Sequence, residues 1–186
     1  MTSPDGRSDP EESRDGPNGD PETVLLSREE LRGRLDVMVA ADGRAHVPVS
    51  VILLDMDGLE TIRAGLGNQV SEAVLGQISD RLRSTVRHGD FVGHVGGEEF
   101  VILCDGIGID VSTRVAERML ALTRRSLDNV PTRFQVRTSI GVASSETISG
   151  VVPTADEMIA QAVAAMRESK RRGANHVIAV AGTAES

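Results

Sequence analysis

Two groups of residues in this sequence have the types and spacing that metal and phosphate chemistry requires. Asp55-Met56-Asp57-Gly58 directly follows an apolar run, and Gly96-Gly97-Glu98-Glu99-Phe100 lies further along the chain. Carboxylates at the end of an apolar strand are costly unless a cation or hydrogen bonds compensate for them. Mg²⁺ commonly binds one or two carboxylates together with substrate phosphates. If the fold brings the two groups together, they predict a divalent-cation site.

Each group on its own has a plainer interpretation. Acids after a strand are most often turn residues or helix caps, and adjacent glycines between strands indicate a hairpin. The glycines also let a backbone approach a phosphate-bearing ligand closely. Phosphoryl transfer needs mainly positioning and charge neutralisation from a protein. The combination of the two groups, rather than either alone, predicts this chemistry.

The composition excludes several classes of partner. The chain has 186 residues, of which 39% are hydrophobic, but its only aromatic residues are Phe91, Phe100 and Phe134. It therefore lacks the aromatic platforms on which single-stranded nucleic acids stack. The net charge of −8 gives no general attraction to nucleic acids or anionic lipids. We expect no nucleic-acid partner and no membrane insertion.

The chain divides into one domain and two tails. Residues 1–22 are acidic and rich in Pro and Gly, which predicts a disordered tail. Residues 23–181 form the expected domain, and residues 182–186 form a C-terminal tail. No signal peptide or long apolar stretch is present, so we expect a cytoplasmic location. Cys104, the only cysteine, ends an apolar run and is expected to be buried and inert.

Hydrophobic periodicity predicts an alternation of helices and strands. Helices are expected over residues 27–43, 60–66, 70–86, 111–122 and 158–173, and strands over residues 49–54, 91–95, 99–103, 134–143 and 177–180. The first of these strands is expected to stop at Asp55, and the last to lie at a sheet edge.

This order predicts an α+β fold with a ferredoxin-like βαββαβ core, a central antiparallel sheet flanked by helices, and an extra C-terminal helix and strand. In that topology the strand over residues 99–103 lies antiparallel beside the strand over residues 49–54. The end of one strand then meets the start of the other. We therefore expect Asp55 to lie close to Glu98 and Glu99.

The same residues resemble those of a known family. Gly96-Gly97-Glu98-Glu99-Phe100 is similar to the signature of GGDEF-domain diguanylate cyclases, which have a palm-type fold. Asp55-Met56-Asp57 resembles the family's Asp-x-Asp, and Ser139-Ile140-Gly141-Val142-Ala143 its SIGVA strand. Lys170, Gly173 and Asn175 resemble its late Lys-x-x-Gly-x-Asn segment. The resemblance covers roughly residues 25–180.

The resemblance implies an activity and a set of site residues. The family condenses two GTP molecules into cyclic di-GMP with release of pyrophosphate, using Mg²⁺ (or Mn²⁺) and two domains that face each other as a homodimer. The implied catalytic residues are Asp55, Glu98 and Glu99; the metal ligands are Asp55, the Met56 carbonyl and Glu98; the substrate-binding residues are Gly58, Leu59, Arg63, Glu72, Gly96, Gly97 and Lys170.

Arg87-His88-Gly89-Asp90 resembles the Arg-x-x-Asp inhibitory site of the family, because five residues separate it from the signature. Arg87 and Asp90 would then bind the product, cyclic di-GMP. Since a lone Arg-x-x-Asp is very common, a simple turn with a surface ion pair is the alternative interpretation.

Several positions depart from the family pattern. Arg63 stands where an Asn reads guanine, and Glu72 where an Asp does. An Arg side chain only donates hydrogen bonds, whereas an Asn side chain also accepts them. Ala174 replaces an Arg near the phosphates, for which Arg171 or Arg172 could substitute. The family's opening motif is absent around residues 25–31.

Three hypotheses follow. The first is an active diguanylate cyclase. The second is a degenerate GGDEF domain that binds GTP or cyclic di-GMP as a regulatory or receptor module without turnover. The third is a domain that serves only as a partner for assembly. Because no sensor domain is recognised in the sequence, we expect dimerisation to come from the domain itself or from a separate sensor or regulatory protein.

Overall fold

The computed structural model describes residues 24–25, 28–45, 47–147 and 151–182. Its elements are β1 (Val24–Leu25), α1 (Arg28–Ala45), β2 (Ser50–Asp57), α2 (Leu59–Leu66), α3 (Asn68–Arg83), β3 (Phe91–Gly96), β4 (Glu99–Cys104), α4 (Ile109–Thr123), β5 (Arg137–Thr147), α5 (Ala155–Arg171) and β6 (His176–Gly182). The tail expected over residues 1–22, the expected cap Ser27 and residues 183–186 lie outside the described residues.

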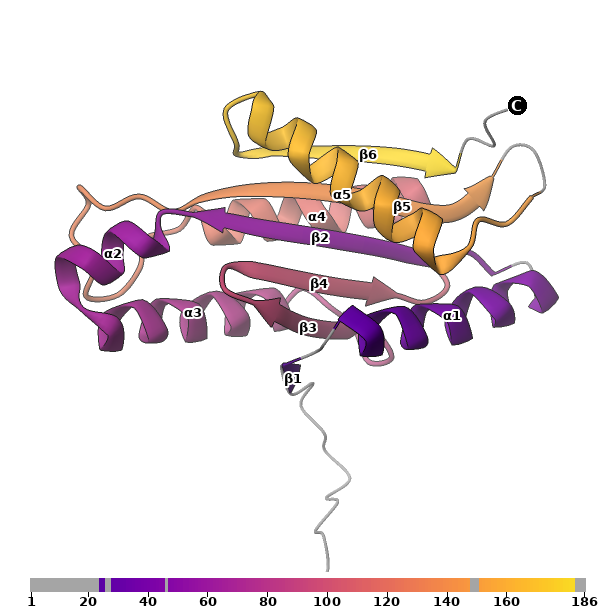
Figure 1. Cartoon of the computed structure of the whole chain (residues 1–186), viewed down its shortest axis with the longest axis horizontal. Helices are drawn as coiled ribbons and strands as arrows, with labels where there is room; N and C mark the ends of the chain where they lie inside the picture. The colour runs from indigo at the N-terminus through magenta and orange to yellow at the C-terminus, as the bar shows by residue number, and fades with distance from the viewer. Residues whose placement is uncertain (1–23, 26–27, 46, 148–150, 183–186) are drawn as a thin grey trace, which may run out of the picture.

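One sheet organises the molecule, with its strands in the order β1-β3-β4-β2-β5-β6. The central strand β2 is antiparallel to both β4 and β5, whereas β6 runs parallel to β5 at one edge (Figure 1). The predicted α+β fold with a central antiparallel sheet flanked by helices is confirmed, as is the edge position of the last strand. The two-residue strand β1, parallel to β3, was not predicted.

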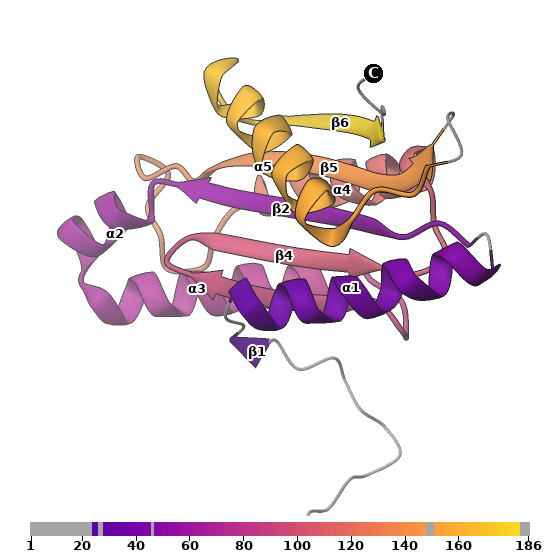
Figure 2. The same ribbon diagram turned by 45° about the vertical axis from the view of Figure 1, so that its right-hand side comes forward.

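Helices cover both faces of the sheet. Because side chains alternate along β2, Ile52 and Leu54 pack in the core shared with α2, α3 and α4, whereas Val51 and Leu53 pack beneath α1 and α5. Figures 1 and 2 show α1 and α5 on the near face and α3 and α4 behind the sheet. The core is almost wholly aliphatic, as the composition predicts, and Cys104 is fully buried within it.

Some predicted boundaries are wrong. Helix α1 continues to Ala45, beyond the expected stop at Asp42-Gly43, and α3 ends at Arg83, before residue 86. Strand β2 runs through Asp55 to Asp57, because β5 supplies backbone partners for these residues. Strand β5 begins at Arg137 rather than at Phe134, whose amide donates to the Pro131 carbonyl in a turn at 2.9 Å.

Helix α5 is held closely against the sheet at a defined position. Its N-terminus has a capping box formed by Thr154 and Glu157. Gly141 of β5 lies against the α5 backbone at Ala162 and Met166, where a side chain on residue 141 would clash. This close approach fixes the path of α5 across the sheet and therefore the position of Lys170 in its last turn.

The late Lys-x-x-Gly-x-Asn segment forms the return from α5 to β6. Gly173, Ala174 and Asn175 all have positive φ angles, of 100°, 60° and 58°. The Asn175 amide donates to the Thr138 carbonyl at 2.8 Å, and its side-chain oxygen accepts from the Thr138 amide at 3.2 Å. Asn tolerates the left-handed region better than most residues, so this position has a clear structural role.

Candidate active site

The ends of β2 and β4 bring the two acidic groups together. Asp55 is the register partner of Glu99, and the Met56 amide donates to the Glu98 carbonyl at 3.1 Å. The meeting of strand ends predicted from the element order is therefore confirmed. Two groups of acids that are far apart in the sequence lie at one end of the central strands.

Asp55 is a buried carboxylate with a cation beside it. Alternation along β2 places its side chain on the face covered by α5, where only 8% of the residue is exposed. The Lys170 ammonium lies 2.6 Å from Asp55 Oδ1 and 3.5 Å from Asp57 Oδ1. Although partial burial alone would lower it, the hydrogen bonds and charges of the two aspartates raise the pKa of Lys170. Lys170 thus compensates for the charge that Asp55 buries.

Whereas the Asp55 side chain contacts α5, the Glu98 side chain contacts α2. Its Oε1 accepts a hydrogen bond from the Glu60 amide at 3.1 Å, in the first turn of α2. Partial burial, together with the negative charges of Asp55 and Asp57, raises the pKa of Glu98, while this hydrogen bond and the charge of Arg63 oppose the rise. The carboxylates therefore repel one another at close range.

This donor set fits a magnesium ion. The carboxylates and the Met56 backbone carbonyl supply only oxygen, and a divalent cation would relieve their repulsion. Within the described ranges, no three His, Cys, Asp or Glu side chains form a metal-binding cluster by themselves. The remaining ligands would come from water and substrate phosphates, as is common for Mg²⁺.

The turn after β2 requires glycine. Gly58 has a φ of 116°, and a side chain there would clash with the Gln135 carbonyl. Its carbonyl accepts from the Ile62 amide at 3.1 Å, and the buried Leu59 begins α2. This tight turn places backbone amides of α2 beside the acids.

The predicted Gly-Gly hairpin is present between β3 and β4. Gly96 and Gly97 have φ angles of 113° and 59°, and open space surrounds both positions where a side chain would project. His94 Nε2 lies 3.0 Å from the Gly97 carbonyl oxygen, and its ring centroid lies 4.8 Å from that of Phe100. His94 therefore has a structural role in the hairpin.

The two candidate base-reading residues lie in different surroundings. Glu72 of α3 lines a cavity of about 340 Å³ together with Leu75, His94 and Phe100. Arg63 is exposed on α2 and does not line this cavity; its charge acts on Glu98 instead. Of these two residues, Glu72 alone lines this cavity.

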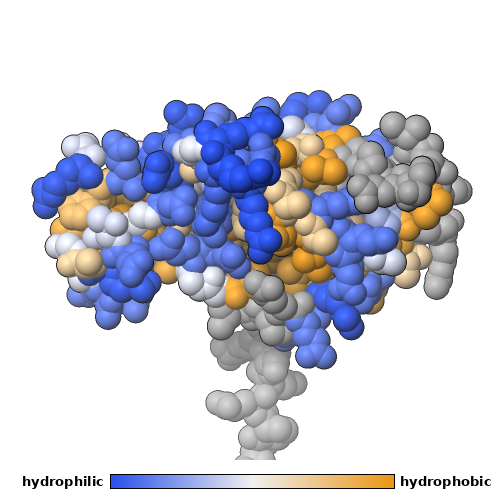
Figure 3. All heavy atoms as spheres, turned by 45° about the horizontal axis from the view of Figure 1, so that its top comes forward, coloured by the Kyte–Doolittle hydropathy of each residue, from blue (hydrophilic) through white to orange (hydrophobic). Residues whose placement is uncertain are grey.

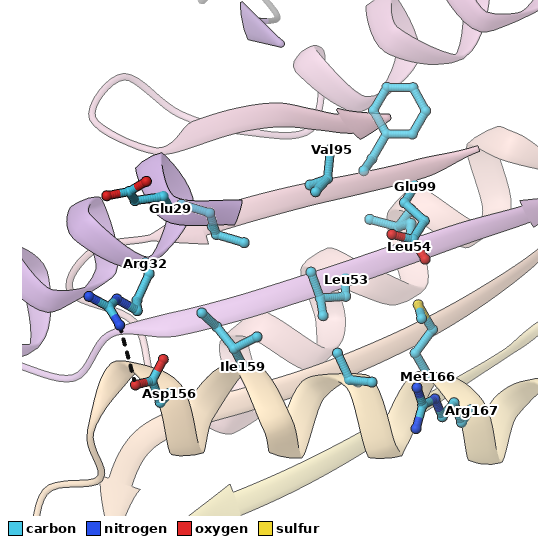
Figure 4. A pocket seen from close by; sticks show the side chains of 13 residues that line it. Glu29, Arg32, Leu53, Leu54, Val95, Glu99, Asp156, Ile159, Met166 and Arg167 are labelled. Carbon is cyan, nitrogen blue, oxygen red and sulfur yellow. Dashed lines mark ion pairs between the residues drawn. The ribbon is translucent and has the colours of Figure 1, made fainter. Parts of the chain in front are cut away.

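Glu99 lies at a larger cavity of about 570 Å³ between α1 and α5. Figure 4 shows Glu99 from β4 and Arg167 from α5 at one end, and the 3.8 Å ion pair between Arg32 and Asp156 at the other. On the face shown in Figure 3, apolar side chains form a band beside a ridge of hydrophilic ones. Sequence reasoning missed this cavity, because its apolar lining has the same helical spacing as an ordinary core.

Arg87 and Asp90 form an ion-paired turn after α3. Arg87 Nε lies 3.5 Å from Asp90 Oδ1, and the Arg87 amide donates to Asp90 Oδ2 at 3.2 Å. The Arg87 guanidinium also donates to the Asp105 carbonyl. This geometry is that of a simple turn with a surface ion pair. The Arg87 side chain nevertheless remains 58% exposed.

The cations proposed to replace the missing family arginine are paired elsewhere. Arg172 Nε donates to Glu168 Oε1 at 2.7 Å, and Arg171 also pairs with Glu168. Ala174, at the position of the missing arginine, is buried. Sequence reasoning also gave no role to the Glu60 amide or to Arg133 and Arg137, which lie close to Gly58 along the walls of a cavity.

The comparisons with known proteins agree with this geometry. Residues 18–176 match the family described as diguanylate cyclase, GGDEF domain. The response regulator PleD of Caulobacter vibrioides is 31% identical over 154 residues, which cover 79% of this chain and 34% of PleD. The chain thus spans about a third of the length of this curated relative.

Solved structures share the fold. The diguanylate cyclase SiaD of Pseudomonas aeruginosa, in complex with its activator SiaC, is 26% identical with a TM-score of 0.72, covering 84% of this chain and 59% of that one. The GGDEF domain of DgcB from Caulobacter crescentus, in complex with c-di-GMP, is 22% identical with a TM-score of 0.74, covering 94% and 98%. None of the described helices is long and apolar enough to span a membrane. From the family match over most of its length, the chain belongs to the GGDEF-domain family of diguanylate cyclases.

Proposed function

We propose that this chain is a diguanylate cyclase that condenses two GTP molecules into cyclic di-GMP as a homodimer and requires Mg²⁺ (or Mn²⁺). The observation that carries the proposal is the pairing of β2 with β4, which sets Asp55 beside Glu99 and the Met56 amide on the Glu98 carbonyl. This arrangement supplies a carboxylate site next to the Gly58 turn. Phosphoryl transfer needs such a site for positioning and charge neutralisation.

Each residue has a role in this proposal. Asp55, Glu98 and the Met56 carbonyl hold the metal ion, which when bound would neutralise charge on the phosphoryl oxygens. The backbone at Gly58 and Leu59 holds phosphates, Gly96 and Gly97 give the nucleotide access to the hairpin, and Glu72 accepts hydrogen bonds from the base. Lys170 would neutralise charge on the terminal phosphates, because a bound metal ion would compensate for Asp55 in its place.

The chemical step joins two nucleotides held by two domains. The 3′-hydroxyl oxygen of one GTP forms a bond to the α-phosphorus of the other, and the bond from that phosphorus to the bridging oxygen of the β-phosphate breaks. Pyrophosphate leaves, and Glu99 accepts the hydroxyl proton. A second transfer in the opposite direction closes the ring. Because each step needs both domains, activity per molecule is expected to rise with protein concentration until the dimer is saturated.

Pyrophosphate release from GTP and Mg²⁺ tests this function. We expect Glu98→Gln to lower the rate by about 100-fold or more, the scale on which loss of a charge-stabilising group acts. Glu117→Gln, on the exposed face of α4, is the matched control and leaves the rate unchanged. Equal turnover in Glu98→Gln and the wild type would eliminate the metal-binding role of Glu98. Mass analysis of products from all four nucleotides, with Mg²⁺ and with Mn²⁺, identifies the base.

A second candidate function is a receptor that binds GTP or cyclic di-GMP without turnover. Two observations favour it: Lys170 is engaged by Asp55 and Asp57, and Arg63 acts on Glu98 rather than lining the cavity beside Glu72. Calorimetry decides between the two functions. Nucleotide binding without any pyrophosphate release supports the receptor, whereas release under the same conditions rules it out.

Product binding at Arg87 and Asp90 is a separate part of the proposal. The exposed Arg87 guanidinium can leave Asp90 and form paired hydrogen bonds with a phosphate or a guanine edge. We expect Arg87→Ala to weaken cyclic di-GMP binding about tenfold or more in calorimetry. Equal affinity in both proteins would remove this site from the proposal. A separate regulatory protein is a further proposed partner, supported by the SiaD–SiaC complex.

A further inference from the structure

The turn after β2 is approached by a second segment of the chain. Gly58 packs against the Gln135 carbonyl, and Gly65 of α2 packs against the ring of Phe134. The loop that leads into β5 therefore runs directly beside the start of α2, where Figure 1 shows the two segments together. A side chain at position 58 would clash with the loop backbone, so the loop is held at a short and defined distance from the turn.

Two arginines lie beside the turn, Arg133 in this loop and Arg137 at the start of β5. Arg133 and Arg137 line a cavity of about 370 Å³ together with Asp57, Gly58 and Thr61. Arg137 is also the register partner of Asp57 in the β2–β5 ladder. The Arg133 guanidinium carbon lies 4.8 Å from the centroid of the Phe134 ring, which orients the side chain.

The guanidinium groups of these two arginines are not neutralised by a nearby carboxylate of the described residues. Within the part of the chain that the structure describes, neither Arg133 nor Arg137 has a carboxylate at ion-pair distance. Three cations at the C-terminal end of α5 differ in this respect. Lys170 is bound to Asp55 and Asp57, and Arg171 and Arg172 are bound to Glu168.

The chemistry of the cavity suits a polyphosphate. Guanidinium groups form forked hydrogen bonds with phosphate oxygens and remain charged at all accessible pH values. A chain with a net charge of −8 does not attract anions in general, so a phosphate ligand must be held by local cations of this kind. At the position where the family resemblance implies an arginine, Ala174 is buried and carries no charge.

We propose that Arg133 and Arg137 bind the β- and γ-phosphates of the substrate, in place of a cation after α5. The role rests on the proposed nucleotide function for its substrate, but the site itself recognises a polyphosphate. Arg133 lies in the loop before β5 and Arg137 at the start of β5, and both line the cavity that Asp57 and Gly58 also line. The phosphates that leave as pyrophosphate would then lie between the metal-binding acids and this loop.

Calorimetry with two probes tests the proposal: tripolyphosphate and GTP, each with excess Mg²⁺. We expect Arg137→Ala to raise the Kd for both probes about tenfold, and Arg133→Ala with Arg137→Ala together to raise it further, because each change removes a charge-assisted contact. Arg137→Lys restores part of the affinity through its charge. The matched control is Arg114→Ala, which removes the same charge from the exposed face of α4 and leaves both Kd values unchanged.

The outcomes separate this inference from the proposed function. Unchanged Kd values in the double variant, in a protein that binds GTP, overturn the inference and leave the function intact. Tripolyphosphate binding that depends on Arg137, without any GTP binding, supports the polyphosphate site and overturns the nucleotide function. A wild-type protein that binds neither probe overturns both. Circular dichroism spectra and melting temperatures confirm that each variant is folded before its Kd is interpreted.

Discussion

The Lys170 ammonium lies 2.6 Å from Asp55 Oδ1 and so joins the last turn of α5 to the strand end that carries the acids. Lys170 is the only lysine in the sequence. Its compact charge can reach two carboxylates at once, since it also lies 3.5 Å from Asp57. The ion pair holds a buried carboxylate in the absence of metal, and the proposed metal site requires that it reorganise.

Removal of this ammonium should destabilise the metal-free protein. Lys170→Met leaves Asp55 buried without its cation, and because the pair is partly exposed we expect a loss of about 1 kcal/mol, or about 2–4 °C in melting temperature. Mg²⁺ should recover much of the loss, because it compensates for the same carboxylate. Melting curves with and without Mg²⁺ measure both effects. If Lys170→Met and the wild type have the same melting temperature in EDTA, the ion pair contributes nothing to stability.

Glu98 should have the opposite effect on stability. Burial and its acidic neighbours raise its pKa, so its charged form is less favourable in the folded protein than in the unfolded chain. In EDTA at pH 7, Glu98→Gln should therefore raise the melting temperature by about 1–2 °C. The same variant should lose the stabilisation that Mg²⁺ gives to the wild type. Glu117→Gln serves as the control, and an equal response to Mg²⁺ in Glu98→Gln would contradict the proposed metal site.

Alanine substitution at two glycines is expected to change the stability of the protein in opposite directions. At Gly141 a methyl group meets the backbone of α5, so we expect Gly141→Ala to cost about 3 kcal/mol through overpacking. At Gly76, on the exposed face of α3, nothing lies within 4 Å, and alanine should stabilise the helix by about 0.5–1 kcal/mol. Urea unfolding measures both. A mild effect at Gly141 would mean that α5 can move away from β5 at little cost.

The capping box of α5 predicts a dependence on pH. The Thr154 amide and hydroxyl donate to Glu157 Oε2 at 2.7 and 2.9 Å, and these hydrogen bonds lower the pKa of Glu157. A carboxylate with a lowered folded-state pKa stabilises the fold above its ordinary value of 4.5, and this contribution is lost as the pH falls through the lower value. The difference in melting temperature between the wild type and Glu157→Gln should therefore be constant near neutral pH and disappear in acid. A difference that persists at pH 2.5 would contradict this role.

The sequence by itself predicted the fold and the meeting of the acids. Alternating and helical apolar patterns are local properties, and the order of elements allows few topologies, so the adjacency of Asp55 to Glu98 and Glu99 followed from the chain alone. The Gly-Gly hairpin and the buried Cys104 followed in the same way. The ends of elements were less accurate, because strands such as β2 continue as long as a neighbouring strand supplies hydrogen-bond partners.

Only the tertiary structure decided how the charges are distributed around this site. It turned Glu98 toward α2 and Glu99 toward α5, bound Lys170 to Asp55, and paired Arg171 and Arg172 with Glu168. It also placed Arg133 and Arg137 beside Gly58, although the sequence offers no motif that links them. The physical reason is that such contacts join elements far apart in the chain, and their partners depend on how closely the helices and loops pack against the sheet.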